Sequence, residues 1–180
     1  EFVGPGIASL RQDTRNAIDA MTTETTCLSS IWETDEKTRQ FLTVHGRAGD
    51  YKPLHPAELA YYDGVVSVDL SKIRPMIALP MHPSNAFPIE ELNANLKDIL
   101  HECEENDQKL MGRSDVKLDL CSKIENGRLR VDQGVIAGCA GGLFDSIYEA
   151  ASILKGHTGG CGDYALSVYP GSQPIMMELN

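Results

Sequence analysis

The sequence has little positive charge: 16 lysine and arginine residues are set against 26 aspartates and glutamates, for a net charge of -10. Nucleic acids and anionic membranes bind proteins through basic surfaces, so this acid excess argues against both as partners. No apolar run approaches the ~20 residues of a membrane span. The first six residues have neither the charged nor the apolar region of a signal peptide. We therefore expect a cytoplasmic protein.

The sequence also lacks paired cysteines and paired histidines. Its five cysteines form an odd number, are widely spaced and include no Cys-x-x-Cys pair, which argues against a disulfide scaffold. The five histidines show no pair at the spacing of a metal motif. The chain of 180 residues starts at Glu1 rather than Met and has no clear terminal element at its polar end. These ends lead us to expect an internal fragment of a longer polypeptide. A length of 180 residues is enough for one ordinary domain or two small ones.

What the sequence does have is a glycine-rich stretch around one cysteine, from Gly134 to Ala150. Val135 and Ile136 suit a short buried strand. Leu143 begins an apolar series with the spacing of a helix, continued by Ile147, Ala150 and Leu154. Cys139 is therefore predicted in the turn between strand and helix, where open α/β sheets carry their chemistry and a helix dipole favours a thiolate. The alternative is that Cys139 is a small buried apolar residue, as free cysteines usually are.

The rest of the first half predicts helices and strands in alternation. Apolar residues at three- and four-residue spacing predict a helix from Leu10 to about Glu24. The stretch from Thr25 to Trp32 is rich in β-formers and predicts a strand. Thr34 is a candidate N-cap for a helix that Gly46 would end, and a further strand is expected over Val65 to Leu70. Four closely spaced prolines then predict a domain linker: Pro75, Pro80, Pro83 and Pro88.

The second half continues the alternation. A helix is expected from near Pro88 to Gly112, with one apolar face and an acidic run, Glu102 to Asp107, on a solvated face. Asn126-Gly127 between two alternating stretches predicts a β-hairpin, and Tyr164 to Tyr169 a final strand. Alternating strands and helices favour parallel crossovers. We therefore predict an α/β fold of three α/β/α layers with mostly parallel sheets, divided into residues 1–74 and 75–180.

Several motifs, taken in order, resemble the aconitase and isopropylmalate isomerase superfamily of iron-sulfur hydro-lyases, as a divergent aconitase-like branch. The turn Val135 to Gly141 is similar to the family's apolar-apolar-Gly-Ser-Cys-Thr-Asn turn and keeps the cysteine. Pro170-Gly171-Ser172 matches the Pro-Gly-Ser that ends a later strand. Two further stretches match in part. The first resembles a family motif that ends in glutamate, through Arg15, Ile18, Met21 and Glu24. The second resembles the family's linker, through Tyr62, Asp63, Asp69 to Ser71, Pro75 and Ala78 to Pro80.

The resemblance implies a lyase that adds or removes water across a carbon-carbon double bond of a small carboxylic acid. It implies a 4Fe-4S cluster with three cysteine ligands, of which Cys139 would be the first. The other two form a Cys-x-x-Cys that would lie beyond Asn180, in the remaining domains of the same polypeptide, so Cys161 is no substitute. Glu24 would be the catalytic carboxylate, hydrogen-bonded to the iron-bound water or hydroxyl. Without the family, Glu24 would be a helix-end carboxylate.

Two alternatives remain at this point. The family's Asn, Thr and Asn are replaced here by Ala20, Ala140 and Gly141, which would fit a degenerate, cluster-less module with a binding or structural role. The glycines from Gly138 to Gly142 could also form an anion or phosphate site at a helix start. For the hydro-lyase, we expect Glu24 and Cys139 to face one cleft between the two domains, within roughly 12 Å.

Overall fold

The computed structural model describes residues 1–158 and 164–180 and divides the chain into two compact units. Unit 1 combines Glu1–Val68 with Gln133–Asn180, and unit 2 is Asp69–Asp132. This division differs from the expected boundary between residues 74 and 75. The reason is that the first helix of the chain packs against the segment around Cys139, so the end of the chain joins the beginning. Such long-range packing leaves no local trace in the sequence.

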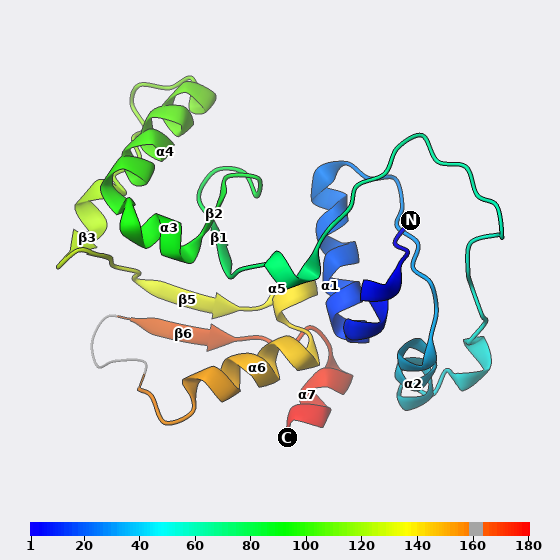
Figure 1. The fold of residues 1–180 in the computed structure, drawn as a ribbon. Coiled ribbons are helices and arrows are strands. Elements are labelled where there is room, and N and C mark those ends of the chain that lie inside the picture. Colours follow the sequence, from blue (N-terminus) through cyan, green and yellow to red (C-terminus); the bar gives the residue numbers. More distant parts are fainter. Residues whose placement is uncertain (159–163) are drawn as a thin grey trace. The chain divides into compact units, whose positions relative to one another are not determined.

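Unit 1 contains one parallel pair of strands. β5 (Gln133–Ile136) pairs with β6 (Ala165–Val168) in the register Val135 to Ser167. The chain between them passes through helices α5 and α6, the connection that parallel strands require (Figure 1). The helices and 3₁₀ turns of the unit are η1 (Pro5–Ser9), α1 (Gln12–Thr22), η2 (Thr23–Thr25), α2 (Glu36–Val44), η3 (Ala48–Asp50), α5 (Gly138–Gly141), α6 (Phe144–Leu154) and α7 (Gln173–Leu179).

Two strands expected in unit 1 are wrong. Thr26 adopts a left-handed conformation with φ +61°, and within the expected strand Thr25 to Trp32 the structure has one isolated bridge, Trp32 to Phe2. Over Val65 to Leu70 the backbone is irregular and Val66 is 90% exposed. β-propensity alone does not form a strand, because its backbone groups need a neighbouring strand. The helix expected after Thr34 is confirmed, but its N-cap is Asp35.

Unit 2 is a helical pair with two antiparallel hairpins. The expected helix from Pro88 to Gly112 is confirmed in two pieces, α3 (Ile89–Ala94) and α4 (Leu96–Met111), and Gly112 ends it at φ +61°. The Asn126-Gly127 hairpin is also confirmed, with both residues at positive φ, as a type I′ turn requires. The remaining elements are η4 (Leu70–Lys72), β1 (Met76–Ala78), β2 (Ala86–Pro88), η5 (Cys121–Lys123), β3 (Ile124–Glu125) and β4 (Arg128–Leu129).

The expectation of mostly parallel sheets is wrong for the described residues. Helices and small sheets are present, as the α/β class requires, but of three two-stranded sheets only β5–β6 is parallel. β1 and β2 are joined by the short segment 79–85, which is too short for the crossover that a parallel pair needs. The three-layer arrangement stays a prediction. Within them, no helix is both long and apolar enough to cross a bilayer.

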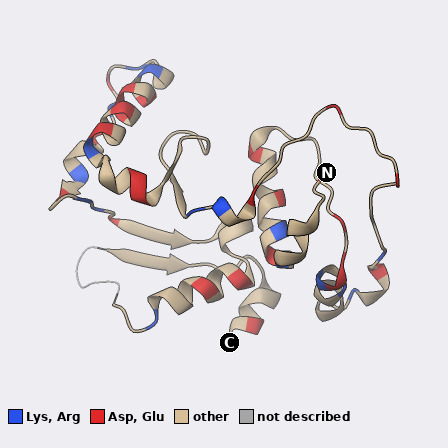
Figure 2. Cartoon of the chain, in the orientation of Figure 1, with Lys and Arg blue, Asp and Glu red and all other residues tan. Residues whose placement is uncertain are grey.

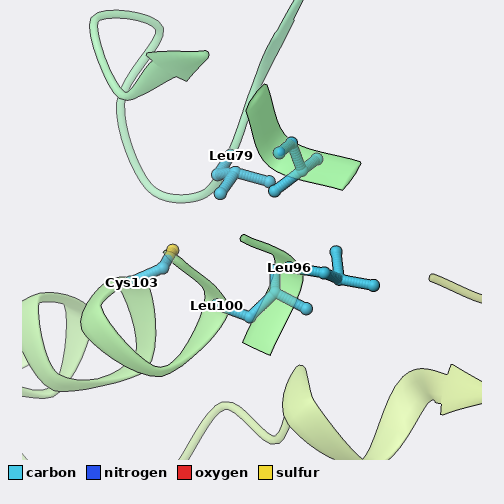
Figure 3. Packing of buried hydrophobic residues seen from close by; sticks show 5 residues of the cluster. Leu79, Leu96, Leu100 and Cys103 are labelled. Carbon is cyan, nitrogen blue, oxygen red and sulfur yellow. The ribbon is translucent and has the colours of Figure 1, made fainter. Parts of the chain in front are cut away.

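The clearest hydrophobic core lies in unit 2, under the apolar face of α4. Leu100 is fully buried there, and Figure 3 shows it beside Leu96, Leu79 and Cys103. Asp107, expected on a solvated face, is instead 2% exposed and accepts a hydrogen bond from the Cys103 thiol at 3.4 Å. Burial, together with Asp107, raises the pKa of that thiol to about 11. Cys103 is therefore a structural, protonated cysteine.

Replacing Leu100 with alanine should destabilise the protein by about 2 to 5 kcal/mol, because it removes apolar burial and leaves a cavity. Leu110→Ala is the matched control, since Leu110 lies on the same helix and is 74% exposed. Urea unfolding followed by circular dichroism measures both. Equal effects of the two substitutions would contradict the core described above.

Candidate functional site: the Cys139 turn

Cys139 lies on a tight strand-to-helix connection in unit 1. β5 ends at Ile136, and Cys139 belongs to the single helical turn α5 before α6 begins. The residue before it, Gly138, has φ +85°, a conformation that favours glycine. The Cys139 side chain is exposed. The order strand, turn, helix expected from the sequence is confirmed, but the cysteine sits in a short helix of its own and the strand is not buried, since Val135 is exposed.

The backbone of the Pro170-Gly171-Ser172 stretch and of the preceding Tyr169 is hydrogen-bonded to this turn. The Gly171 N–H donates to the Gly142 carbonyl at 2.8 Å, and the Tyr169 N–H donates to the Ile136 carbonyl at 2.8 Å. The backbones approach so closely that a Cβ on Gly142 would lie 2.9 Å from the Gly171 nitrogen and 2.7 Å from the Gly138 oxygen. Two motifs that are far apart in the sequence thus form one local structure.

Gly142→Ala should therefore destabilise the protein by about 1 to 3 kcal/mol, because its methyl group would meet backbone atoms that cannot move aside. Gly141→Ala is the control: a Cβ at Gly141 would meet nothing within 4 Å, and its φ is not positive. The midpoints of thermal unfolding compare the two variants. If both lose the same stability, the close approach at Gly142 is not what holds the turn.

Helix α1 ends next to Glu24 and packs against the segment that carries Cys139. α1 packs against α5 and α6. Near its start, the Asp13 carboxylate accepts a hydrogen bond from the Asp145 N–H at 3.2 Å, and Arg11 forms ion pairs with Asp145, at 3.2 Å, and with Glu149. Glu24 lies just beyond the other end of α1, in η2, and is exposed. Glu24 and Cys139 therefore belong to the same unit. The cleft expected between two domains does not describe this placement.

Arg15, noted from the sequence as part of a motif, has a structural role here. Its side chain is fully buried, and its Nη2 atom donates to Asp35 at 2.5 Å and to the carbonyls of Ile7 and Leu10. Asp35 also accepts the Lys37 and Thr38 N–H groups as N-cap of α2. The hydrogen bond from Arg15 lowers the pKa of the Asp35 carboxyl below its usual value. Sequence reasoning missed Asp35.

A pocket of about 430 Å³ opens in unit 1 between α1, α2, α6 and α7, and neither Glu24 nor Cys139 lines it. Its two permanent cations are already engaged. Arg11 pairs with carboxylates of α6, and Lys37 donates to the carbonyls of Ala8 and Leu10. The pocket is therefore poorly equipped to bind a carboxylate substrate by itself.

The other cysteines differ from Cys139 in their surroundings. Cys27 is exposed in unit 1, and Cys121 is half-buried in unit 2. Cys161 lies outside the described residues. Among the described residues, Cys139 belongs to no group of three potential metal ligands, whereas His101, Glu104 and Cys121 in unit 2 form one. The spacing of histidines in the sequence could not indicate that group, because it contains a single histidine and because Cys121 comes from another element, η5.

Comparison with known proteins decides the family. The family model described as the aconitase family (aconitate hydratase) matches residues 1–180. The chain belongs to the aconitase family. The resemblance expected from the order of its motifs is thereby confirmed, and with it an α/β chain related to hydratases.

Relatives in this family are dehydratase large subunits. The chain is 29% identical over 178 residues to the 3-isopropylmalate dehydratase large subunit of Caldicellulosiruptor saccharolyticus, with 99% of the chain and 33% of the relative covered. It is 29% identical over 156 residues to the same subunit of Acetivibrio thermocellus (87% and 29% covered). It is 27% identical over 156 residues to the 2,3-dimethylmalate dehydratase large subunit of Eubacterium barkeri (87% and 29% covered). The chain spans about a third of the length of these relatives.

Proposed function

We propose that this chain is part of an aconitase-like hydro-lyase that adds or removes water across a carbon-carbon double bond of a small carboxylic acid. The observation that carries the proposal is the exposed Cys139 on a turn held by Gly171, at the position where family motifs place a cluster ligand. Family membership and the dehydratase relatives support the reaction class. Their names suggest substituted malates as the first substrates to test.

The residues of this chain fit one ligand of a 4Fe-4S cluster. The Cys139 thiol is exposed, and a Cβ on the flanking Gly138 or Gly141 would meet nothing within 4 Å, so there is open space beside it for a bulky group. The described residues place no further pair of metal ligands around Cys139. The remaining thiolates would come from other domains of the same polypeptide. When bound, such a cluster with one open iron position supplies a Lewis acid for a substrate hydroxyl.

Within this proposal, Cys139 binds the cofactor and Glu24 handles a proton. The turn holds Cys139 in place, because the turn's carbonyls at Ile136 and Gly142 accept hydrogen bonds from the N–H groups of Tyr169 and Gly171. Glu24 is an exposed carboxylate on the unit that also carries Cys139, joined to it through α1. A carboxylate at this position can accept a hydrogen bond from the water or hydroxyl that the reaction adds or removes, and can exchange a proton with it. The cytoplasmic location expected from the sequence stays a prediction.

Replacing Glu24 with glutamine in the complete polypeptide should lower kcat on the order of 100-fold or more, because the amide cannot exchange a proton with the substrate. Iron and sulfide content should stay unchanged, since Glu24 is not proposed as a ligand. Glu58→Gln, at another exposed glutamate of unit 1, is the control. A Glu24→Gln protein with the kcat of the parent would remove Glu24 from the proposed mechanism.

The complete polypeptide, prepared without oxygen and combined with any partner subunit, tests the reaction class itself. We expect stoichiometric iron and sulfide, and conversion of 3-isopropylmalate or 2,3-dimethylmalate to the unsaturated acid, which absorbs in the ultraviolet. A protein that is folded but holds no iron and sulfide under these conditions would overturn the proposal. That result would favour the cluster-less binding or structural module.

A further inference from the structure

Three side chains of different chemistry converge on the surface of unit 2. His101 and Glu104 lie one turn apart on α4, and Cys121 is the first residue of η5, which packs beside that helix. One nitrogen, one oxygen and one sulfur atom from these residues all lie within 4.8 Å of one another. The group belongs to no paired-histidine or Cys-x-x-Cys motif, because the sequence has neither, so only the packing of η5 on α4 creates it.

The structure holds one of the three groups, the Glu104 carboxylate, in place. One oxygen of Glu104, Oε1, accepts the Cys121 N–H at 2.7 Å, which leaves Oε2 directed toward His101 Nδ1 at 3.9 Å. The Glu104 side chain is only 19% exposed. Leu120 and Cys121 pack against the core of unit 2, so the η5 backbone is held against α4. The carboxylate is thus positioned before any ion binds, whereas the Cys121 thiol, which donates to the Lys97 carbonyl at 3.8 Å, and the exposed His101 ring turn toward the ion.

We infer that His101, Glu104 and Cys121 form a site for a zinc ion. Imidazole, carboxylate and thiolate are the three ligand types that zinc accepts together, whereas calcium and magnesium need oxygen ligands throughout. Zinc bonds of ~2.0 to 2.3 Å place tetrahedral ligand atoms ~3.3 to 3.8 Å apart. The observed spread of up to 4.8 Å reaches that range by side-chain rotation. Three protein ligands leave the fourth position to water.

The surroundings support a cation at this point. Glu105 Oε1 lies 3.7 Å from His101 Nε2, so when Nδ1 binds the ion the Nε2–H can donate to Glu105. That carboxylate–histidine arrangement is the usual outer shell of a zinc site, and it makes Glu105 a positioning residue. The exposed face of α4 carries three carboxylates, Asp98, Glu102 and Glu105, beside two lysines, Lys97 and Lys109 (Figure 2). The two carboxylates that lie closest to His101, those of Glu104 and Glu105, favour a cation at this point.

This site is independent of the proposed cluster. It lies in unit 2, whereas Cys139 and Glu24 lie in unit 1. Its test needs neither catalytic activity nor the ligands expected elsewhere in the polypeptide. The two proposals can therefore fail separately.

Cobalt titration of the metal-free 180-residue chain under reducing conditions tests the inference. We expect one equivalent of Co²⁺ to give the ultraviolet sulfur-to-cobalt charge-transfer band of a thiolate ligand, and Zn²⁺ to displace it. Cys121→Ser should abolish the band. His101→Gln and Glu104→Gln should weaken zinc binding on the order of 100-fold in competition with a chromogenic zinc chelator. Glu104→Gln keeps an oxygen for the Cys121 N–H, so it is expected to fold.

Matched controls separate the site from other thiols and imidazoles. Cys139→Ser, Cys27→Ser and His82→Gln alter exposed residues outside the group and should leave the band and the zinc affinity unchanged. Glu105→Gln keeps all three ligands and should weaken zinc binding about tenfold, an effect that a purely structural role of the group would not produce. A band that survives Cys121→Ser, a band lost in Cys139→Ser, or no saturable binding would each overturn the inference.

Discussion

The Cys139→Ser variant of the complete polypeptide should lose its iron-sulfur cluster and its hydro-lyase activity together. A serine hydroxyl is a poor replacement for a thiolate, and two remaining cysteines would have to hold the four irons. The substitution itself is mild for the fold, because Cys139 is exposed. The loss of activity should therefore come from the cofactor and not from unfolding.

Iron and sulfide assays, together with the visible absorption of the anaerobic protein, measure this result. Cys27→Ser is the matched control, because Cys27 is also an exposed thiol of unit 1. It should retain the cluster. A Cys139→Ser protein with a full complement of iron and sulfide would show that Cys139 is not a ligand, whatever the family of the chain.

Asp35→Ala should destabilise unit 1 by about 3 to 5 kcal/mol, the largest stability effect that we expect of any single substitution. The fully buried Arg15 guanidinium would lose its only carboxylate among the described residues, at 2.5 Å, and remain charged away from water. The same substitution removes the N-cap of α2, where Asp35 accepts the N–H groups of Lys37 and Thr38.

Urea unfolding of the parent and of the Asp35→Ala protein checks this prediction. Asp69→Ala is the control, since Asp69 also caps a turn but lies exposed in unit 2 and faces no buried cation. We expect about 1 kcal/mol or less there. An Asp35→Ala protein no less stable than Asp69→Ala would mean that the buried guanidinium is satisfied by carbonyl oxygens alone.

The pH dependence of stability follows from the same pair. Arg15 lowers the pKa of Asp35 in the folded state, so the folded protein binds fewer protons than the unfolded chain. The stabilisation is therefore fully present above the unfolded pKa of roughly 4 and is lost as the pH falls from there through the lower folded pKa. The stability difference between the parent and Asp35→Ala should shrink over that acid range and stay constant near neutral pH.

Local patterns in the sequence were enough to predict the elements next to the site. The helix around Ile18, the helix from Pro88 to Gly112 and the Asn126-Gly127 hairpin depend on neighbouring residues, and all three are present. The strand, the Cys139 turn and the following helix were likewise predicted, because a short apolar run, glycines and a helical repeat lie side by side in the chain. The order of the motifs also indicated the family.

Tertiary packing decided the features that depend on contacts between residues far apart in the chain. The strand expected at Val65 did not form, because a strand without a neighbour leaves its backbone groups unpaired. The Asp35–Arg15 pair and the convergence of Glu104 with Cys121 arise only when separate elements pack together. The sequence determined where most of the longer helices form, which turns need glycine and where the candidate cysteine lies, but it did not indicate the C-terminal helix α7. The structure alone decided which side chains meet, because burial and hydrogen bonding act between residues that chain order does not place together.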